Sequence, residues 1–102
     1  MNMRSYNCCS ANTYNVSNVS PLATLLKLIC VESRLKILYI LQEGDHCVCE
    51  IEKHIDESQS LISHHLRTLK KAGLIKDRKK GQFVHYELTE NGKHIISSLS
   101  KL

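Results

Sequence analysis

The cysteines of this chain are grouped in a way that suits metal chemistry. Cys8 and Cys9 are adjacent, Cys47 and Cys49 are separated by one residue, and Cys30 stands alone. Thiolates bind soft metal ions, and an odd number of cysteines does not suit a closed disulfide framework. The grouped cysteines therefore predict a site for a soft ion.

The spacing of Cys47 and Cys49 also constrains the structure around them. Inside a regular helix the two side chains would point about 200° apart, so one ion could not be held by both. The sulfurs can converge if Cys47 lies at or before the helix N-cap and Cys49 just inside the helix. A helix start also lowers the pKa of a thiol and so favours the thiolate. The pair therefore predicts a helix that begins at this point.

A second group of chemically useful side chains lies on residues 58–73. At helical spacing this segment has two faces. The apolar face, expected in the core, consists of Leu61, Ile62, Leu66 and Leu69. The opposite face carries side chains that suit base edges and phosphates: Gln59, Ser60, Ser63, His64 and Arg67.

The adjacent pair His64 and His65 does not predict a metal site. Neighbouring residues of a helix diverge by about 100°, so the two rings cannot chelate one ion together. We expect one of them to face DNA and the other to pack sideways.

Charge is unevenly distributed along the chain, although the net charge is only +4. Half of the basic residues fall within residues 67–80, where Asp77 is the single acid: Arg67, Lys70, Lys71, Lys76, Arg78, Lys79 and Lys80. Residues 43–57 instead carry six acids against Lys53: Glu43, Asp45, Glu50, Glu52, Asp56 and Glu57. One part of the chain suits polyanions and the other suits cations.

Length and composition indicate one ordinary folded domain. The chain has 102 residues, of which 42% are hydrophobic and 24% charged. No apolar run approaches the ~20 residues of a membrane span, and the N-terminus lacks the apolar stretch of a secretory signal. We therefore expect a cytoplasmic protein that does not enter a membrane. No enzyme is expected, because the Cys-x-Cys pair has no neighbouring base and no motif for an organic cofactor.

Capping residues and apolar spacing predict the elements that hold these side chains. Residues 1–19 are polar and should form a flexible N-terminal arm that carries Cys8 and Cys9. Residues 20–102 should form one domain. Its first helix is expected to start at Ser20-Pro21, and the second should run from near Ser33 to a stop at Gly44. The third should start near Cys47 or Val48 and include Ile51 and Ile55. The fourth should start after a cap at Ser58 and end at Gly73.

The C-terminal part predicts a two-stranded hairpin and a last helix. Residues 74–78 and 83–88 suit strands joined by residues 79–82. Thr89 suits the cap of the last helix, in which Ile95, Ile96, Leu99 and Leu102 give more apolar surface than a small core can absorb. We expect this face and the first helix to be buried against a second subunit.

Four segments in this order resemble the ArsR/SmtB family of winged-helix metal-sensing repressors, over roughly residue 22 to the C-terminus. They are Ser33-Arg34-Leu35-Lys36-Ile37-Leu38, Cys47-Val48-Cys49-Glu50-Ile51, Ser58-Gln59-Ser60 through Ala72-Gly73-Leu74-Ile75, and Tyr86-Glu87-Leu88-Thr89. The resemblance implies an α+β, mostly α fold: a winged helix-turn-helix of five helices with a two-stranded β-wing, acting as a dimer. It also implies repression of transcription through an operator inverted repeat and release by a metal or metalloid ion.

The resemblance assigns roles to the residues that match. The base-facing role goes to Gln59, Ser60, Ser63, His64 and Arg67, and the phosphates go to Lys70, Lys79 and Lys80. Cys47 and Cys49 supply two metal ligands, whereas the family pattern's third cysteine, three residues later, is replaced by Glu52. Cys8, Cys9 or both are expected to complete the site, as in family members that sense cadmium and lead through a cysteine arm.

Several alternatives stay open at this point. The effector could be cadmium, lead, zinc, or trivalent arsenic or antimony. A redox sensor, in which Cys47 or Cys9 forms a disulfide with Cys49, is the alternative function. We expect Cys30 to be a buried structural cysteine and His46 to be a solvated loop residue. A second metal site on the last helix is not expected, because only Glu90 and His94 are present there.

Overall fold

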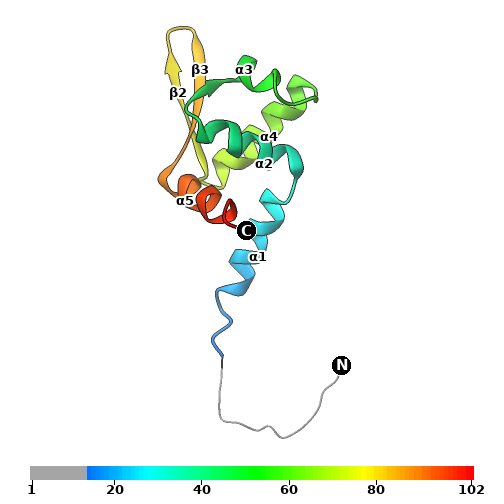
Figure 1. Cartoon of the computed structure of the whole chain (residues 1–102), viewed down its shortest axis with the longest axis vertical. Coiled ribbons are helices and arrows are strands. Elements are labelled where there is room, and N and C mark those ends of the chain that lie inside the picture. Colours follow the sequence, from blue (N-terminus) through cyan, green and yellow to red (C-terminus); the bar gives the residue numbers. More distant parts are fainter. Residues whose placement is uncertain (1–13) are drawn as a thin grey trace, which may run out of the picture.

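The computed structural model describes residues 14–102, and over that range the chain forms five helices and three strands (Figure 1). In chain order they are α1 (Val19–Ile29), α2 (Glu32–Gln42), β1 (His46–Cys47), α3 (Val48–Glu52), α4 (Gln59–Lys71), β2 (Ile75–Lys80), β3 (Phe83–Leu88) and α5 (Glu90–Leu99). The expected five helices and the two-stranded wing are thus confirmed. None of the helices in this part of the chain has the length and apolar character needed to cross a membrane.

Hydroxyl caps fix the starts of the two helices that flank the wing. The Ser58 Oγ accepts a hydrogen bond from the Leu61 N–H at 3.1 Å. The Thr89 Oγ1 accepts from the Gly92 N–H at 3.0 Å and donates to the Gly73 carbonyl oxygen at 2.7 Å. Both caps satisfy helix N–H groups that would otherwise lack a partner, and Thr89 also ties the start of α5 to the end of α4.

The sheet has one strand more than the sequence predicted. Strands β2 and β3 form an antiparallel hairpin that turns at Gly81, whose φ of 60° suits glycine. The short strand β1 pairs with the other edge of β3, giving the order β1-β3-β2. In this register His46 lies opposite Tyr86, and Cys47 lies opposite His85. Residue His46, expected in a solvated loop, is therefore a half-buried strand residue.

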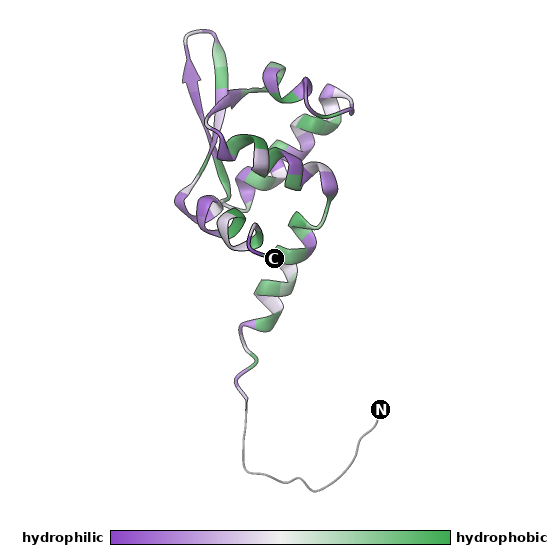
Figure 2. Ribbon diagram, in the orientation of Figure 1, coloured by the Kyte–Doolittle hydropathy of each residue, from purple (hydrophilic) through white to green (hydrophobic). Residues whose placement is uncertain are grey.

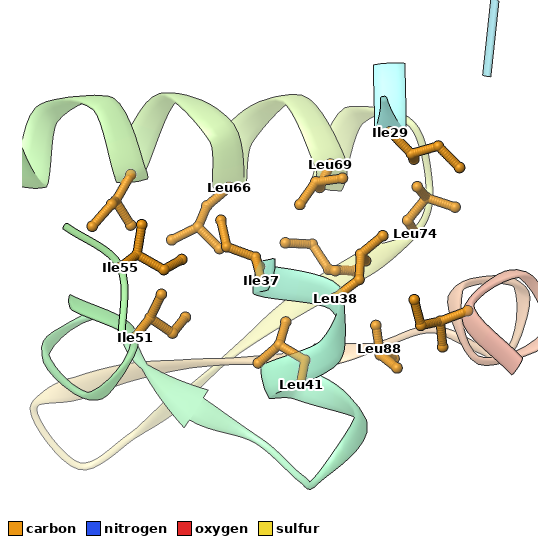
Figure 3. Close-up of a cluster of buried hydrophobic side chains, with 13 residues drawn as sticks. Ile29, Ile37, Leu38, Leu41, Ile51, Ile55, Leu66, Leu69, Leu74 and Leu88 are labelled. Carbon is orange, nitrogen blue, oxygen red and sulfur yellow. The ribbon is translucent and has the colours of Figure 1, made fainter. Parts of the chain in front are cut away.

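The core lies between α2, α4 and the sheet (Figure 3). Its fully buried residues include Ile37 and Leu38 from α2, and Leu66 and Leu69 from α4. Figure 2 shows hydrophilic residues over most of β2, which forms the outer strand of the wing.

Two expectations about the core were wrong in detail. Leu61 was placed in the core, but it is 40% exposed, because Ile62 takes the inward position in this turn of α4. Ile55 is buried as expected, yet it follows α3, which already ends at Glu52. The chain turns between these two points before Ser58 starts α4.

Close packing at Gly92 gives a stability prediction. A Cβ atom on Gly92 would clash with the backbone carbonyl of Leu74, and a backbone group cannot move aside as a flexible side chain would. We expect Gly92→Ala to lower the free energy of unfolding by about 1–3 kcal/mol, as overpacking does. Chemical unfolding measures this, with the exposed neighbour in Asn91→Ala as the control; equal stability of the two variants would contradict it.

Candidate cysteine site and nucleic-acid interface

Cys47 and Cys49 lie at the start of α3. Cys47 is the last residue of β1 and the N-cap of the helix, with extended backbone angles (φ −83°, ψ 166°), and Cys49 is the second helical residue. Their Cα atoms are 5.4 Å apart, and the structure joins the two sulfurs as a disulfide. The residues are therefore placed as convergence requires, with the first outside the helix and the second inside it.

The backbone at the pair is held by the third residue of the helix. The Glu50 Oε1 accepts a hydrogen bond from the Cys47 N–H at 2.9 Å. Cys47 is buried and Cys49 is exposed, so the pair is reached by solvent from the Cys49 side. The donor set of the reduced pair, two adjacent thiolates, fits a soft ion.

Two sulfurs do not fill the coordination of such an ion. Among residues 14–102, no group of three or more histidine, cysteine or acidic side chains is arranged to hold a metal. Cys8 and Cys9, expected to complete the site, lie outside the described residues. Glu52 replaces the third cysteine of the family pattern, and its Oε2 is buried without a hydrogen-bond partner in the described part of the chain.

Cys30 is not the buried residue that we expected. It is an exposed free cysteine that caps the C-terminus of α1. Ile29 takes the buried position there, so the next side chain is turned away from the core. Cys30 is therefore available as a control residue outside the pair.

The polar face of α4 is open to solvent. Gln59, Ser60, His64 and Arg67 are exposed, and Ser63 is half-buried. A shallow depression on the helix surface is lined by Gln59, Ser60, Ser63 and Arg67. Within residues 14–102 Arg67 makes no ion pair with an acid. The structure thus brings together the side chains that the sequence assigned to base contacts. They lie on an exposed face of α4 that could enter a groove of DNA.

The lysines assigned to phosphates have different partners. Lys70 Nζ donates to the Asp77 Oδ2 at 2.9 Å, and this hydrogen bond raises the pKa of Lys70. Lys80 Nζ donates to the Asp45 Oδ2 at 2.6 Å. Lys79 is exposed on β2 and pairs with no acid in the described range.

Sequence reasoning missed the contacts that two acids make with basic side chains of the wing. Asp45 contacts Lys80, and this hydrogen bond is the main reason why the pKa of Asp45 is lowered. Glu87 lies 4.0 Å from Lys76 and 3.9 Å from Arg78. The strand pairing of β2 with β3 could have indicated Glu87, because Lys76 lies directly opposite it. Asp45 gave no local signal, since it lies 35 residues from Lys80 in the chain.

The two histidines of α4 diverge as expected. His64 is exposed on the polar face, whereas His65 is only 5% exposed. The Nδ1 of His65 accepts from the Arg34 Nε at 3.0 Å, so the ring is neutral and its proton is on Nε2. That nitrogen lies 3.5 Å from the Glu57 Oε1. Arg34 also donates to the Leu28 carbonyl oxygen at 2.9 Å and so connects α1, α2 and α4.

This contact predicts that stability depends on pH. Burial, and then the positive charge of Arg34, lower the pKa of His65 below its usual 6.5. The unfolded chain therefore binds a proton more readily than the folded one, and the stability present above about pH 6.5 is lost as pH falls through the folded pKa. We expect chemical unfolding to show that the free energy of unfolding falls as pH is lowered through 6.5, the usual pKa of histidine.

A matched pair of variants separates His65 from the other histidines. His65→Gln keeps a donor and an acceptor but does not titrate, so the drop should shrink. His64→Gln changes an exposed neighbour and should keep the full drop. An equal pH dependence of both variants would show that His65 is not its source.

The sheet order, the α3-turn-α4 unit and the exposed polar helix define a winged helix-turn-helix protein. A profile described as "Bacterial regulatory protein, arsR family" matches residues 32–77. The chain is also 40% identical over 85 residues to a cadmium resistance transcriptional regulatory protein CadC homolog of Staphylococcus aureus; the match covers 82% of this chain and 69% of that protein. The chain therefore belongs to the ArsR family of bacterial regulatory proteins.

Other comparisons agree with this assignment. The arsenical resistance operon repressor of Escherichia coli K12 is 46% identical over 66 residues, which cover 64% of this chain and 56% of the repressor. HlyU from Vibrio cholerae has a TM-score of 0.73 at 35% identity, covering 83% of this chain and 94% of that one. The repressor BigR from Xylella fastidiosa has a TM-score of 0.75 at 28% identity, covering 82% and 84%. The match thus spans little more than half of the Escherichia coli repressor.

Proposed function

We propose that this protein is a homodimeric repressor that binds an operator inverted repeat and is released by a soft metal or metalloid ion. The ion is bound by Cys47 and Cys49 together with Cys8, Cys9 or both. The observation that carries the proposal is the placement of Cys47 and Cys49 at the start of α3, directly before the helix with the exposed polar face. The names of the Escherichia coli and Staphylococcus aureus relatives, which refer to arsenical and cadmium resistance, support an ion of this class.

The proposed DNA contacts divide into base contacts and phosphate contacts. Arg67 offers two parallel donors to a guanine in the major groove, and Gln59, Ser60, Ser63 and His64 lie on the same exposed face. Lys70 lies near the end of α4, and Lys79 and Lys80 lie on β2 of the wing, where they suit DNA phosphates.

Apolar surface on α1 and α5 supports the proposed homodimer. Leu22 and Leu26 are 53% and 45% exposed on α1, and Leu102 beyond α5 is almost fully exposed. Ile96, which was expected on the dimer face, is instead fully buried in the core of the same chain and does not contribute to that interface. In a symmetric dimer the two copies of α4 would enter major grooves about 34 Å apart, one helical turn.

The packing of α3 against α4 supports the proposed coupling. Ile51 of α3 and Ile62 of α4 belong to one buried cluster, so the close packing offers a path by which a shift of α3 would reach α4. Binding an ion needs both thiols reduced and ionised, and it draws Cys47, Cys49 and the arm to one point. We infer that this changes the backbone of Cys47 and of α3, and through the core the position of α4.

A thiol redox sensor is the second candidate function. It is favoured by one observation, the disulfide that the structure forms between Cys47 and Cys49. In this alternative, oxidation of the two thiols to the disulfide transfers two electrons and two protons to an oxidant such as a peroxide. Release from DNA would then need no metal.

One titration separates the two candidates. An operator is selected from a random duplex pool with the reduced wild-type protein. The complex is then exposed to cadmium, lead, zinc or arsenite under a reductant, and separately to peroxide with a chelator. Release in the first arm, with absorption from sulfur-to-metal bonds, supports the ion sensor. Release only in the second arm would replace it with the redox sensor.

A further inference from the structure

Asp45 connects the wing to residues 45–49, the cysteine segment. It lies in the loop between α2 and β1, two residues before Cys47. One oxygen of its carboxylate, Oδ2, accepts from the Lys80 Nζ at 2.6 Å and contacts the His85 Nδ1 at 3.1 Å. The Nη2 of Arg78 lies 4.0 Å from the same oxygen. Asp45 therefore partly neutralises the basic face of the wing.

The backbone makes the same connection. In the β1–β3 ladder Cys47 lies opposite His85, which is also the residue whose ring contacts Asp45. A movement of the backbone at Cys47 therefore reaches the wing along two routes, the strand pairing and the carboxylate. Asp77 provides a contrast, because it pairs with Lys70 from within the wing and belongs to no part of the cysteine segment.

We propose that Asp45 is a positioning residue that competes with DNA phosphate for Lys80 and Arg78, and that the state of the cysteine pair sets its hold on them. The proposal rests on the proposed function. A carboxylate and a phosphate both offer anionic oxygens to Lys and Arg, so one basic group cannot be fully shared between them. The side chains of Lys80 and Arg78 are 46% and 55% exposed, so a phosphate can reach them.

The two states of the cysteine segment differ in how easily Asp45 can release Lys80. When Cys47 and Cys49 are free thiols, residues 45–49 can adjust and Lys80 can turn to a phosphate. When both cysteines are fixed as ligands, Asp45 is held against the wing and retains Lys80. The wing then presents less positive charge to DNA, which adds to the effect of α4 on release.

The first test uses ion-free, reduced protein and Asp45→Asn, which keeps the shape of the side chain but removes its charge. We expect binding to any duplex to tighten about two- to fivefold, the scale of one exposed ion pair. The salt dependence of log K should steepen by about 0.9 for each additional phosphate that the protein neutralises. Asp45→Asn in a Lys80→Gln background should tighten binding less, since Lys80 is then absent.

The second test measures release by cadmium, with Asp77→Asn as the matched control. Both variants free one lysine, and only Asp45 lies on the cysteine segment. The ratio of ion-free to cadmium-saturated operator affinity should fall at least about threefold in Asp45→Asn, within the range of one exposed ion pair. The ratio should be unchanged in Asp77→Asn.

The outcomes are distinguishable. The role of Asp45 would be overturned if the salt dependence of log K in Asp45→Asn equalled that of the wild type. It would also be overturned if Asp45→Asn and Asp77→Asn lost the cadmium response equally. If the wild-type protein is not released by any ion, the proposed function fails, while the ion-free salt slopes still decide whether Asp45 competes with phosphate.

Discussion

Replacing Cys47 or Cys49 by serine is expected to abolish release of the operator by the ion. A serine hydroxyl is a poor ligand for a soft ion, and a single remaining thiolate cannot draw the start of α3 to the site. To weaken operator binding about a hundredfold, the ion must favour the released state by about 2.7 kcal/mol. Most of that difference should disappear in either variant.

The ion-free affinity of these variants is the internal check. Neither cysteine lies on the exposed face of α4, so binding to the operator without an ion should stay close to wild type. Cys30→Ser is the matched control, because Cys30 is an exposed free cysteine at the end of α1. It should keep the full response. Normal release from both the Cys47 and the Cys49 variant would show that the pair is not the sensor.

Arg67→Ala is expected to weaken operator binding by about 1–3 kcal/mol, the scale of one bidentate base contact. Competition with duplexes that carry each base substitution should show that discrimination is lost at one guanine. Arg67→Lys keeps the positive charge but not the paired donors, so it should restore non-specific affinity more than specificity.

Lys71→Ala is the control for charge on the same helix. Lys71 is exposed in the last turn of α4, and it is not among the residues proposed to contact bases. Its loss should weaken binding to all duplexes by a similar factor. Equal specificity profiles of the Arg67 and Lys71 variants would contradict the assignment of Arg67 to a base.

Local chemistry made much of the fold predictable. Ser58 and Thr89 are caps because a short side-chain oxygen satisfies the free N–H groups of the first turn, and both start helices as expected. A strand was expected at residues 83–88, and β3 has these bounds. The 100° step of a helix was enough to separate exposed His64 from buried His65.

Long-range contacts were outside the reach of such patterns. The strand β1 has two residues, too few for an alternating pattern, and it exists because β3 offers a free edge. The ion pair of Asp45 with Lys80 depends on that strand, which brings the loop before it alongside the wing. Arg34 and His65 likewise meet only because α2 packs on α4. The prediction of burial was wrong for Leu61 and Cys30, because in each case the adjacent isoleucine is the residue that is buried in the core.

Operator affinity of the reduced wild-type protein, measured with and without a saturating soft ion, tests the sensor mechanism most directly. Fluorescence anisotropy of a labelled operator, at one fixed salt concentration, gives both values. We predict that the saturated protein binds at least about a hundredfold more weakly, at the upper end of ordinary coupling between two sites. Equal affinity of the saturated and the ion-free protein, with sulfur-to-metal absorption proving that the ion is bound, would contradict it.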